Sequence, residues 1–247
     1  MEIDEQILIP SHLSKHLLLD QAKEPSAQLK TLLNHFKQRR TISDRVYDVM
    51  IKVDRKNFVN DETFHSPYAD MPRPIGFNTT ISAPGVHAET LQKLIEGLRP
   101  GAVALDIGTG SGYVAACFAE LVGKEGKVYM VDHLQQIIDL AKNNIMKGNP
   151  ILLKQKRIIP VMQDGRKGLP QYGPYDVIHI GGAIPSLPQE IVQQLKPKGM
   201  IWAPVGPKEA QSIIIYKKDE QGNLSEEEIM DVRYGSLCSV EEQLSGD

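Results

Sequence analysis

The amino-acid sequence predicts an α/β protein built around a doubly wound parallel sheet. The main observation is the stretch Asp106–Gly112, where a glycine turn follows an apolar run and precedes a helix-compatible run. A second observation is the regular alternation of strand-like and helix-like segments from residue 86 onward. A third is a pair of strand-like runs around a polar turn near the C-terminus, which predicts an antiparallel hairpin.

The N-terminal region divides into an extension and the start of the main domain. Residues 1–25 are interpreted as an N-terminal extension, in which Ser11 caps a short helix that runs to Leu19. Residues 26–247 are interpreted as the main domain. Its first residue, Ser26, is a predicted N-cap for a helix with an apolar face.

A second helix and a long irregular stretch follow. The second helix is capped at Ser43 or Asp44 and carries an apolar stripe. Residues 57–85 are rich in Pro, Gly, Asn and Thr, so a long helix is not expected there. Because structureless stretches of this length are uncommon in compact domains, a functional loop is expected.

From residue 86 onward the apolar pattern predicts alternating helices and strands. The expected helices are residues 86–98, 114–121, 134–146 and 188–195. The expected strands are residues 102–107, 127–131, 158–162, 175–180 and 200–205. The hairpin is expected over residues 211–217 and 228–234, around the turn at 219–223.

The glycine turn has the spacing G-x-G-x-G at residues 108–112, directly after Asp106 and Ile107. Glycines lack Cβ atoms, so they allow tight turns and a close approach of a ligand to the backbone. A dinucleotide fingerprint requires a small residue at position 113, where this sequence has Tyr113. The turn and the five β/α units therefore favour a class I methyltransferase that binds S-adenosylmethionine, with a Rossmann-like sheet.

Two acidic residues follow neighbouring strands of the expected sheet. Asp132 ends the second strand, where a carboxylate can accept hydrogen bonds from both ribose hydroxyls of a cofactor. An N-cap of the following helix is an equally supported role for it. Asp164 and Gly165 follow the third strand, where they either face an adenine amino group or form an ordinary Asp-Gly turn.

Two further segments lie close to this expected site. Gly181 and Gly182 follow the fourth strand, and they either keep space open or pack tightly. His179, inside that strand, is expected to be a packed or hydrogen-bonded core residue. The loop 75–84 concentrates hydroxyl and amide donors, which suits a cover over a cofactor or a plain Pro-rich connection.

Composition narrows the function classes. With 28 basic and 31 acidic residues, the formal charge of −3 provides no electrostatic case for nucleic acid or an anionic membrane. No apolar run approaches ~20 residues, and no secretory signal is visible. Cys117 and Cys238 lie far apart without metal-site spacing. A cytoplasmic protein without a bound metal is therefore expected.

Several motifs together resemble the protein-L-isoaspartate (D-aspartate) O-methyltransferase family over about residues 26–243. The loop I-G-F-x-x-T-I-S-A-P, joined to the glycine turn, is highly specific to this family. The matching motifs are residues 68–84 (YADMPRPIGFNTTISAP), 104–112 (ALDIGTGSG), 127–133 ending in VDH, 164–166, 174–179, and 194–197 leading to 204–207.

The resemblance implies methyl transfer from S-adenosylmethionine to the carboxylate of L-isoaspartyl and D-aspartyl residues in damaged proteins. The methyl ester then starts repair through a succinimide. Ser82 matches the active-site serine of the family. The residues that match cofactor contacts of the family are Ile75, Gly76, Phe77, Asn78, His87, Ile107, Gly108, Thr109, Gly110, Ser111, Asp132, His133, Asp164, Gly165 and Gln243.

The sequence departs from the family pattern at two places. Gly85 replaces the first histidine of the family's H-x-H, and Cys238 stands where threonine is expected. The alternatives are a class I methyltransferase with another acceptor and a non-catalytic cofactor-binding subunit. A dehydrogenase is opposed by Tyr113 and by the absence of a catalytic Tyr-Lys pair. The expected partners are isoaspartyl proteins or peptides, and the expected state is a monomer with residues 1–25 as a docking element.

Overall fold

The computed structural model describes residues 26–59 and 66–245, and within them a central sheet of seven strands dominates the fold. The five strands that come first along the chain run parallel, and the last two are antiparallel. In order across the sheet, the strands are β5 (Ile158–Met162), β4 (Lys127–Asp132), β3 (Val103–Ile107), β6 (Tyr175–Ile180), β7 (Leu195–Val205), β8 (Gln211–Lys218) and β9 (Leu224–Val232). This order confirms the doubly wound class and its C-terminal hairpin.

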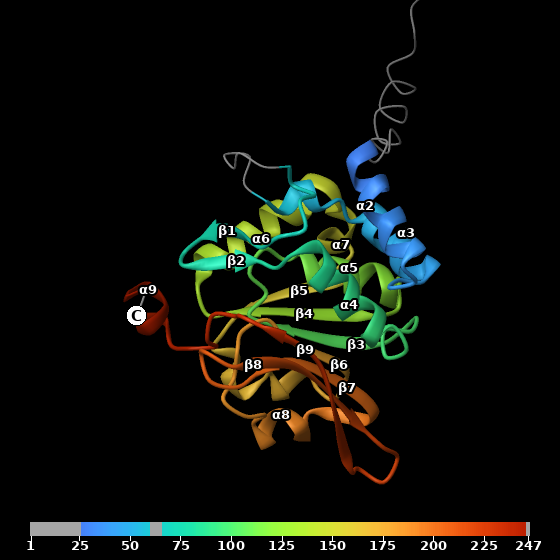
Figure 1. The fold of residues 1–247 in the computed structure, drawn as a ribbon. Helices are drawn as coiled ribbons and strands as arrows, with labels where there is room; N and C mark the ends of the chain where they lie inside the picture. The colour runs from blue at the N-terminus through green and yellow to red at the C-terminus, as the bar shows by residue number, and fades with distance from the viewer. Residues whose placement is uncertain (1–25, 60–65, 246–247) are drawn as a thin grey trace, which may run out of the picture.

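Helices cover both faces of the sheet. Figure 1 shows α4, α5 and α6 on one side of it and α8 on the other. The helices are α2 (Ala27–Gln38), α3 (Asp44–Lys52), α4 (Pro84–Leu94), α5 (Tyr113–Val122), α6 (Gln135–Gly148), α7 (Pro150–Lys154), α8 (Gln189–Gln193) and α9 (Val240–Ser245). None of the helices in the described ranges is long and apolar enough to cross a membrane. The predicted helix ending at Leu19, within the extension 1–25, lies outside the described residues.

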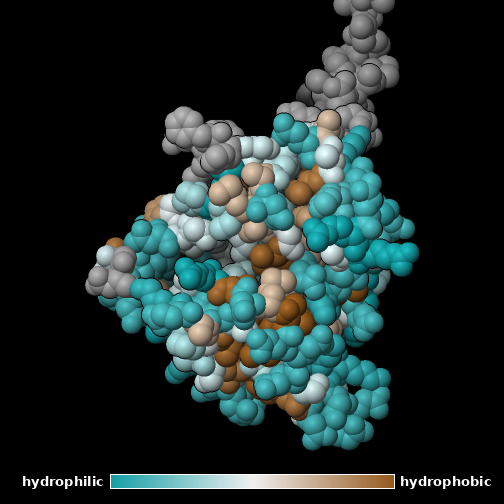
Figure 2. Space-filling model, viewed as in Figure 1, coloured by the Kyte–Doolittle hydropathy of each residue, from teal (hydrophilic) through white to brown (hydrophobic). Residues whose placement is uncertain are grey.

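Each parallel strand sends alternate side chains into two separate hydrophobic clusters. On β3, Ala104 packs into the cluster that also contains residues of α2 to α6. Leu105 and Ile107 pack into the opposite cluster, together with Ile191 of α8. Figure 2 shows hydrophobic residues gathered over the middle of one face and hydrophilic residues over the end of the β8–β9 hairpin.

Several boundaries differ from the sequence prediction. The helix predicted over 188–195 is only Gln189–Gln193, because Leu195 already pairs with Tyr175 as part of β7. Residues 196–199, which separate the predicted helix from the predicted strand, lie at the register shift between β6 and β7. The short helices α7 and α9 were not predicted from the sequence. The Ser26 N-cap is confirmed, since the Ser26 hydroxyl accepts a hydrogen bond from the Leu29 amide at 3.1 Å.

A small hairpin lies inside the stretch that the sequence analysis left irregular. It consists of β1 (Arg73–Gly76) and β2 (Thr79–Ile81), which pair antiparallel. Phe77 and Asn78 between them have φ values of 54° and 53°. A two-residue turn with both φ values positive matches the twist of a hairpin. Phenylalanine is uncommon in that conformation, so the turn carries no recognisable sequence signal.

Asp176, at the start of β6, joins three segments at the amino end of the sheet. Its carboxylate accepts hydrogen bonds from the Lys196 ammonium at 2.7 Å, the Arg99 guanidinium at 2.8 Å and the Val103 amide at 2.8 Å. Burial alone would raise the pKa of Asp176. The hydrogen bonds from Lys196 and Val103 and the two positive charges outweigh burial and hold that pKa below its ordinary value.

Replacing Asp176 by asparagine is expected to lower the free energy of unfolding by about 2 kcal/mol at pH 7. A depressed carboxyl pKa stabilises the fold above the ordinary value of 3.8, and this contribution is lost as the pH falls through the folded-state pKa. The difference between wild type and variant in urea unfolding should therefore shrink below about pH 4. Asp139→Asn is the control, because the ion pair between Asp139 and Lys142 is exposed. If Asp139→Asn changed the free energy of unfolding by more than about 0.5 kcal/mol, the larger effect of Asp176→Asn could not be assigned to burial.

Candidate functional site

A cavity of about 390 Å³ lies at the carboxyl ends of the central strands. Its walls come from the β1–β2 hairpin, the strand ends, the loop after β7, and the segment from Tyr234 through α9. Ligand pockets in proteins span about 300–1,000 Å³ and favour the switch point of doubly wound sheets. The site residues predicted from the sequence that line it are Asn78, Ser82, Gly108, Asp132, His133, Asp164, Gly165 and Gln243.

The glycine turn connects β3 to α5 and contributes Gly108 to the cavity lining. Gly108, Gly110 and Gly112 have φ values of 66°, 53° and 83°, which favour glycine. The amides of Gly108 and Thr109 both donate to the Val131 carbonyl, at 2.9 and 3.1 Å. These two bonds tie the turn to β4, so the ends of two neighbouring strands form one rigid surface.

A buried polar pair lies beneath this turn. Asp106 Oδ2 accepts from the Thr109 hydroxyl at 2.6 Å, and Asp106 Oδ1 lies 2.7 Å from His179 Nδ1. Asp106 is fully buried and His179 is nearly so. The expected core role of His179 is confirmed, because its ring orients the carboxylate that holds the turn.

Asp132 ends β4 and lies just before α6, whose N-cap position is Leu134 rather than Asp132. Its carboxylate accepts from the Leu134 amide at the start of α6 and from the Gly110 amide, each at 3.4 Å. It also lines the cavity. Burial raises the pKa of Asp132 above its ordinary value, although the Leu134 and Gly110 amides oppose the rise. The long hydrogen bonds leave acceptor capacity for hydroxyl groups in the cavity.

Asp164 caps the 3-10 helix Gly165–Lys167 rather than forming an ordinary Asp-Gly turn, and both Asp164 and Gly165 line the cavity. Asp164 accepts from the Arg166 amide at 3.0 Å and forms a two-point contact with the Arg166 guanidinium, at 2.6 and 2.9 Å. This contact with Arg166 lowers the pKa of Asp164. A Cβ atom on Gly165 would lie 2.5 Å from Ile107 Cγ2, so only glycine fits beside β3.

Gly181 and Gly182 permit close backbone contacts at the end of β6. A Cβ atom on Gly181 would lie 2.5 Å from the Gly108 carbonyl oxygen, and one on Gly182 would lie 3.1 Å from the Leu237 amide nitrogen. Both glycines line the cavity as well. Gly181 and Gly182 therefore both pack tightly and keep space open, which were the two alternatives from the sequence. Their tight packing brings the glycine turn and the C-terminal segment to one wall of the cavity.

Ser82 and Tyr234 are neighbours on the cavity lining. The Ser82 hydroxyl donates to the Tyr234 hydroxyl at 2.9 Å. The buried Gln211 side chain holds the Tyr234 backbone on both sides, accepting from its amide at 2.7 Å and donating to its carbonyl at 3.2 Å. Burial raises the pKa of Tyr234, so its phenol is neutral at pH 7.

Gln243 on α9 connects two walls of the cavity. Its side-chain amide donates to the Phe77 carbonyl at 2.9 Å, and its Oε1 lies 2.6 Å from His133 Nε2. Asn78 Nδ2 donates to the Gln243 backbone carbonyl at 2.9 Å. The C-terminal helix is thereby linked both to the β1–β2 turn and to the end of β4.

His87 does not line the cavity. It is buried, with its ring centroid 4.6 Å from that of Tyr113 and its Nδ1 3.3 Å from the Arg55 guanidinium. Burial and then the Arg55 charge lower the pKa of His87 well below its ordinary value. A neutral ring accepts the Arg55 hydrogen bond, so the structure assigns His87 a contact in the core rather than at the cavity surface.

The remaining predicted residues lie next to the cavity wall rather than on it. They belong to the β1–β2 hairpin and the glycine turn, and most are buried behind the lining residues. The predicted residues that do not line the cavity are Ile75, Gly76, Phe77, Ile107, Thr109, Gly110 and Ser111, together with His87.

Sequence reasoning missed several lining residues that come from late in the chain. Tyr234, Lys208 and Glu242 line the cavity, although none of the three was among the predicted site residues. Tyr234 and Glu242 reach it because the β8–β9 hairpin returns the chain to the carboxyl edge of the sheet, and Lys208 lies in the loop that follows the carboxyl end of β7. No local pattern signals that return.

Comparisons with known proteins agree on one family. Residues 27–242 match the family model described as Protein-L-isoaspartate(D-aspartate) O-methyltransferase (PCMT). The chain is 40% identical to Protein-L-isoaspartate O-methyltransferase 1 of Arabidopsis thaliana over 223 residues, which covers 90% of this chain and 94% of the relative. It is 35% identical to Protein-L-isoaspartate O-methyltransferase of Caenorhabditis elegans over 213 residues, covering 86% and 93% of the two chains.

A solved structure has the same fold. It is from Plasmodium falciparum, is assigned as a protein-L-isoaspartate O-methyltransferase, and contains S-adenosyl-L-homocysteine. The TM-score is 0.78 at 29% identity, and the match covers 86% of this chain and 99% of that chain. The family resemblance predicted from the sequence motifs is confirmed.

Proposed function

Because this chain belongs to the protein-L-isoaspartate (D-aspartate) O-methyltransferase family, we propose that it methylates the carboxylate of L-isoaspartyl and D-aspartyl residues in damaged proteins. The methyl donor is S-adenosylmethionine. The observation that supports this most directly is the position of Ser82, which lines the same cavity as Gly108 and Asp132. A donor site and a substrate-facing hydroxyl therefore share one enclosed space.

The cavity residues fit an adenosyl cofactor. The Asp132 carboxylate is nine-tenths buried, lines the cavity and retains acceptor capacity for ribose hydroxyls. Gly108, Gly181 and Gly182 leave backbone exposed where side chains would close the space. We assign the other predicted cofactor residues on the lining, Asn78, His133, Asp164, Gly165 and Gln243, to the same site. S-adenosylmethionine, when bound, supplies an electrophilic methyl group on a positively charged sulfur.

The protein itself needs to position the acceptor rather than activate it. A carboxylic acid with a pKa of about 4 is ionised at neutral pH, so its oxygen attacks without a general base. Ser82 holds one carboxylate oxygen and leaves the other free to react. In this structure the Ser82 hydroxyl donates to the Tyr234 hydroxyl. When the substrate carboxylate is bound, the Tyr234 hydroxyl would donate to Ser82 instead, so that the Ser82 proton points to the substrate. Correct alignment supplies several kcal/mol of the barrier reduction.

The product of this step is a methyl ester, which the substrate itself processes further. The backbone nitrogen of the next residue attacks the ester carbonyl, and methanol leaves as the succinimide ring closes. Hydrolysis reopens that ring in part to a normal aspartyl residue, which is the repair. We place the reaction in the cytoplasm, which suits the two free cysteines Cys117 and Cys238, and we propose that the enzyme acts as a monomer.

The decisive experiment compares an isoaspartyl peptide with its aspartyl twin. With labelled S-adenosylmethionine, methyl incorporation into the isoaspartyl peptide should exceed that into the twin by about 10²-fold or more, because a misplaced carboxylate loses its alignment. Cofactor binding is measured in the same samples by calorimetry. Equal labelling of both peptides, or binding without any turnover, would overturn the proposed acceptor.

One observation favours a different acceptor as the second candidate. Cys238 lines the cavity at the position where the family has threonine. Gly85 replaces a family histidine, and a Cβ atom there would lie 2.9 Å from Asp70 Oδ2. If the isoaspartyl peptide is inactive but the cofactor binds, a panel of proteins and small carboxylic acids becomes the test of this candidate.

A further inference from the structure

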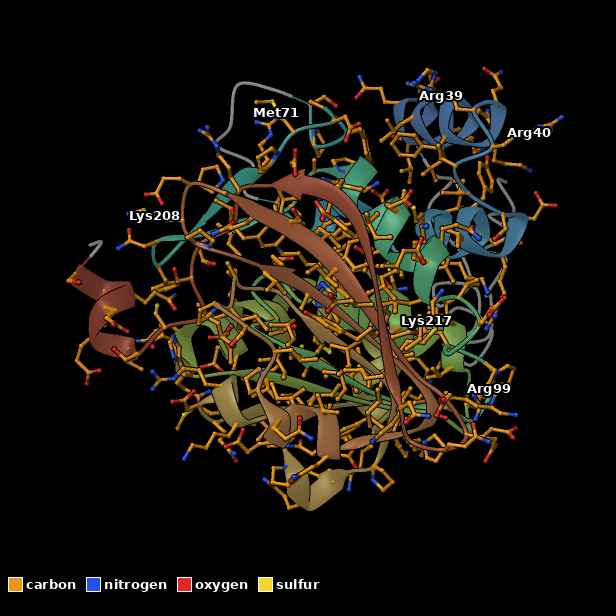
Figure 3. The ribbon with its side chains drawn as sticks, turned by 60° about the horizontal axis from the view of Figure 1, so that its bottom comes forward. Arg39, Arg40, Met71, Arg99, Lys208 and Lys217 are labelled. Carbon is orange, nitrogen blue, oxygen red and sulfur yellow. The ribbon has the colours of Figure 1, made fainter. Side chains whose placement is uncertain are left out.

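Lys208 occupies the rim of the cavity, in the loop that joins β7 to β8. The loop turns through a hydrogen bond from the Ala210 amide to the Pro207 carbonyl at 3.0 Å. Lys208 lines the cavity and is exposed to solvent. Figure 3 shows it on the side of the molecule that carries α9 and the β1–β2 hairpin, which form other walls of the cavity.

The charges around the cavity make this lysine distinctive. Among the described lining residues, Lys208 is the sole lysine or arginine, whereas Asp132, Asp164 and Glu242 are acidic. Arg166 forms an ion pair with Asp164, and the Ser239 amide donates to Glu242. No described carboxylate lies within ion-pair distance of Lys208.

Two other exposed lysines in the described part of the chain illustrate the contrast, because each has an acidic partner. Lys217 pairs with Glu227 at 3.4 Å on the β8–β9 hairpin. Lys198 forms an ion pair with Glu220. Lys208 thus combines two properties that those lysines lack, a place on the cavity wall and an ammonium group without a described ion-pair partner.

On the basis of the proposed function, we propose that Lys208 selects protein substrates with an acidic side chain beside the damaged residue. The ammonium group would pair with an Asp or Glu near the isoaspartyl residue. The flanking acid, rather than the reacting carboxylate, is the partner for two reasons. The first reason is position, because Ser82 and Tyr234 provide the inner contact to the reacting carboxylate and Lys208 lies at the exposed rim.

The second reason is the change of charge during the reaction. The attacking carboxylate loses its negative charge as the methyl bond forms. An ion pair with that carboxylate would stabilise the ground state more than the transition state, which slows the reaction. A flanking acid keeps its charge throughout, so its pairing with Lys208 contributes equally to both states and appears as tighter substrate binding.

The test uses three isoaspartyl peptides that differ only in having Glu, Gln or Lys next to the isoaspartyl residue. For the wild-type chain at low salt, kcat/KM should be about two- to five-fold higher for the Glu peptide than for the Gln peptide, as expected for an exposed ion pair. Raising the salt concentration should reduce this ratio. Lys208→Gln should abolish the preference, and Lys208→Glu should shift it toward the Lys peptide.

Lys124→Gln is the matched control. Lys124 is also exposed and has no described ion-pair partner, but it precedes β4 at the opposite end of the strands from the cavity. It should retain the wild-type preference. A wild-type chain without preference, or a Lys208→Gln variant that keeps it, would overturn the inference. An increase in the cofactor Kd for Lys208→Gln would instead assign the lysine to the cofactor's own carboxylate and would equally overturn it.

Peptide affinities, measured by fluorescence anisotropy, separate this inference from the proposed function. If no peptide is methylated but the Glu peptide still binds more tightly and Lys208→Gln removes the difference, the proposed reaction fails and Lys208 keeps its role. If peptides are methylated but Glu and Gln peptides bind and react equally, the reaction stands and the role of Lys208 is rejected.

Discussion

Replacing Ser82 by alanine is expected to lower kcat for the isoaspartyl peptide about 10²-fold, because the acceptor carboxylate loses the contact that aligns it. The cofactor Kd should stay within about two-fold of wild type, since the proposed ribose contact, Asp132, does not depend on Ser82. Steady-state methylation kinetics give kcat, and calorimetry with S-adenosylhomocysteine gives Kd.

Tyr234→Phe provides the companion to this experiment. It keeps the partly buried ring and removes only the hydroxyl that contacts Ser82. The expected loss in kcat is smaller than for Ser82→Ala, again without a change in cofactor affinity. If Ser82→Ala weakens cofactor binding as much as it lowers turnover, Ser82 is a structural residue and the proposed alignment role is rejected.

Replacing Asp132 by alanine is expected to raise the cofactor Kd about 10- to 100-fold, the cost of losing hydrogen bonds to a buried charged acceptor. Calorimetric titration of S-adenosylhomocysteine measures the change. Thermal unfolding without the cofactor accompanies it, because Asp132 also accepts from the Leu134 and Gly110 amides. Asp139→Ala, on the exposed surface of α6, is the control and should bind the cofactor as wild type does.

The raised pKa of Asp132 gives this prediction a pH dependence. As the pH falls through that pKa, the carboxylate gains a proton and loses acceptor capacity, so cofactor affinity should fall. Because burial raises the pKa, the loss begins at a higher pH than for an aspartate with the ordinary value of 3.8. Asp132→Asn has no proton to gain and should lack this step. A step of the same size in Asp132→Asn would assign it to another group.

The sequence pattern predicted β6 well because this strand is buried on both faces and lies between Gly173–Pro174 and Gly181–Gly182. The bounds of β5 and β6 were both predicted as observed. The β1–β2 hairpin was missed because Phe77 occupies a turn position that favours Gly or Asn. The start of β7 was predicted at residue 200 but lies at Leu195. The register shift that extends this strand depends on its pairing with β6, which the sequence of one strand does not show.

The candidate site was also predicted only in part. The glycine turn, Asp132 and Asp164 were recognised because each follows a strand, and parallel strands end at one edge. His87 follows the lining residue Ser82 closely in the sequence, yet its ring packs in the core against Tyr113. Helical periodicity alone does not tell which of two buried surroundings a side chain enters.

By itself the sequence determined the doubly wound sheet, the glycine turn and the family to which the chain belongs, because local spacing and motif order are properties of the chain. Only the tertiary structure decided that Ser82 faces Tyr234, that Gln243 contacts His133, and that Lys208 reaches the cavity rim. The first two of these contacts join residues more than 100 positions apart. Their geometry depends on how the C-terminal hairpin packs against the sheet, and this packing has no signature in any single segment.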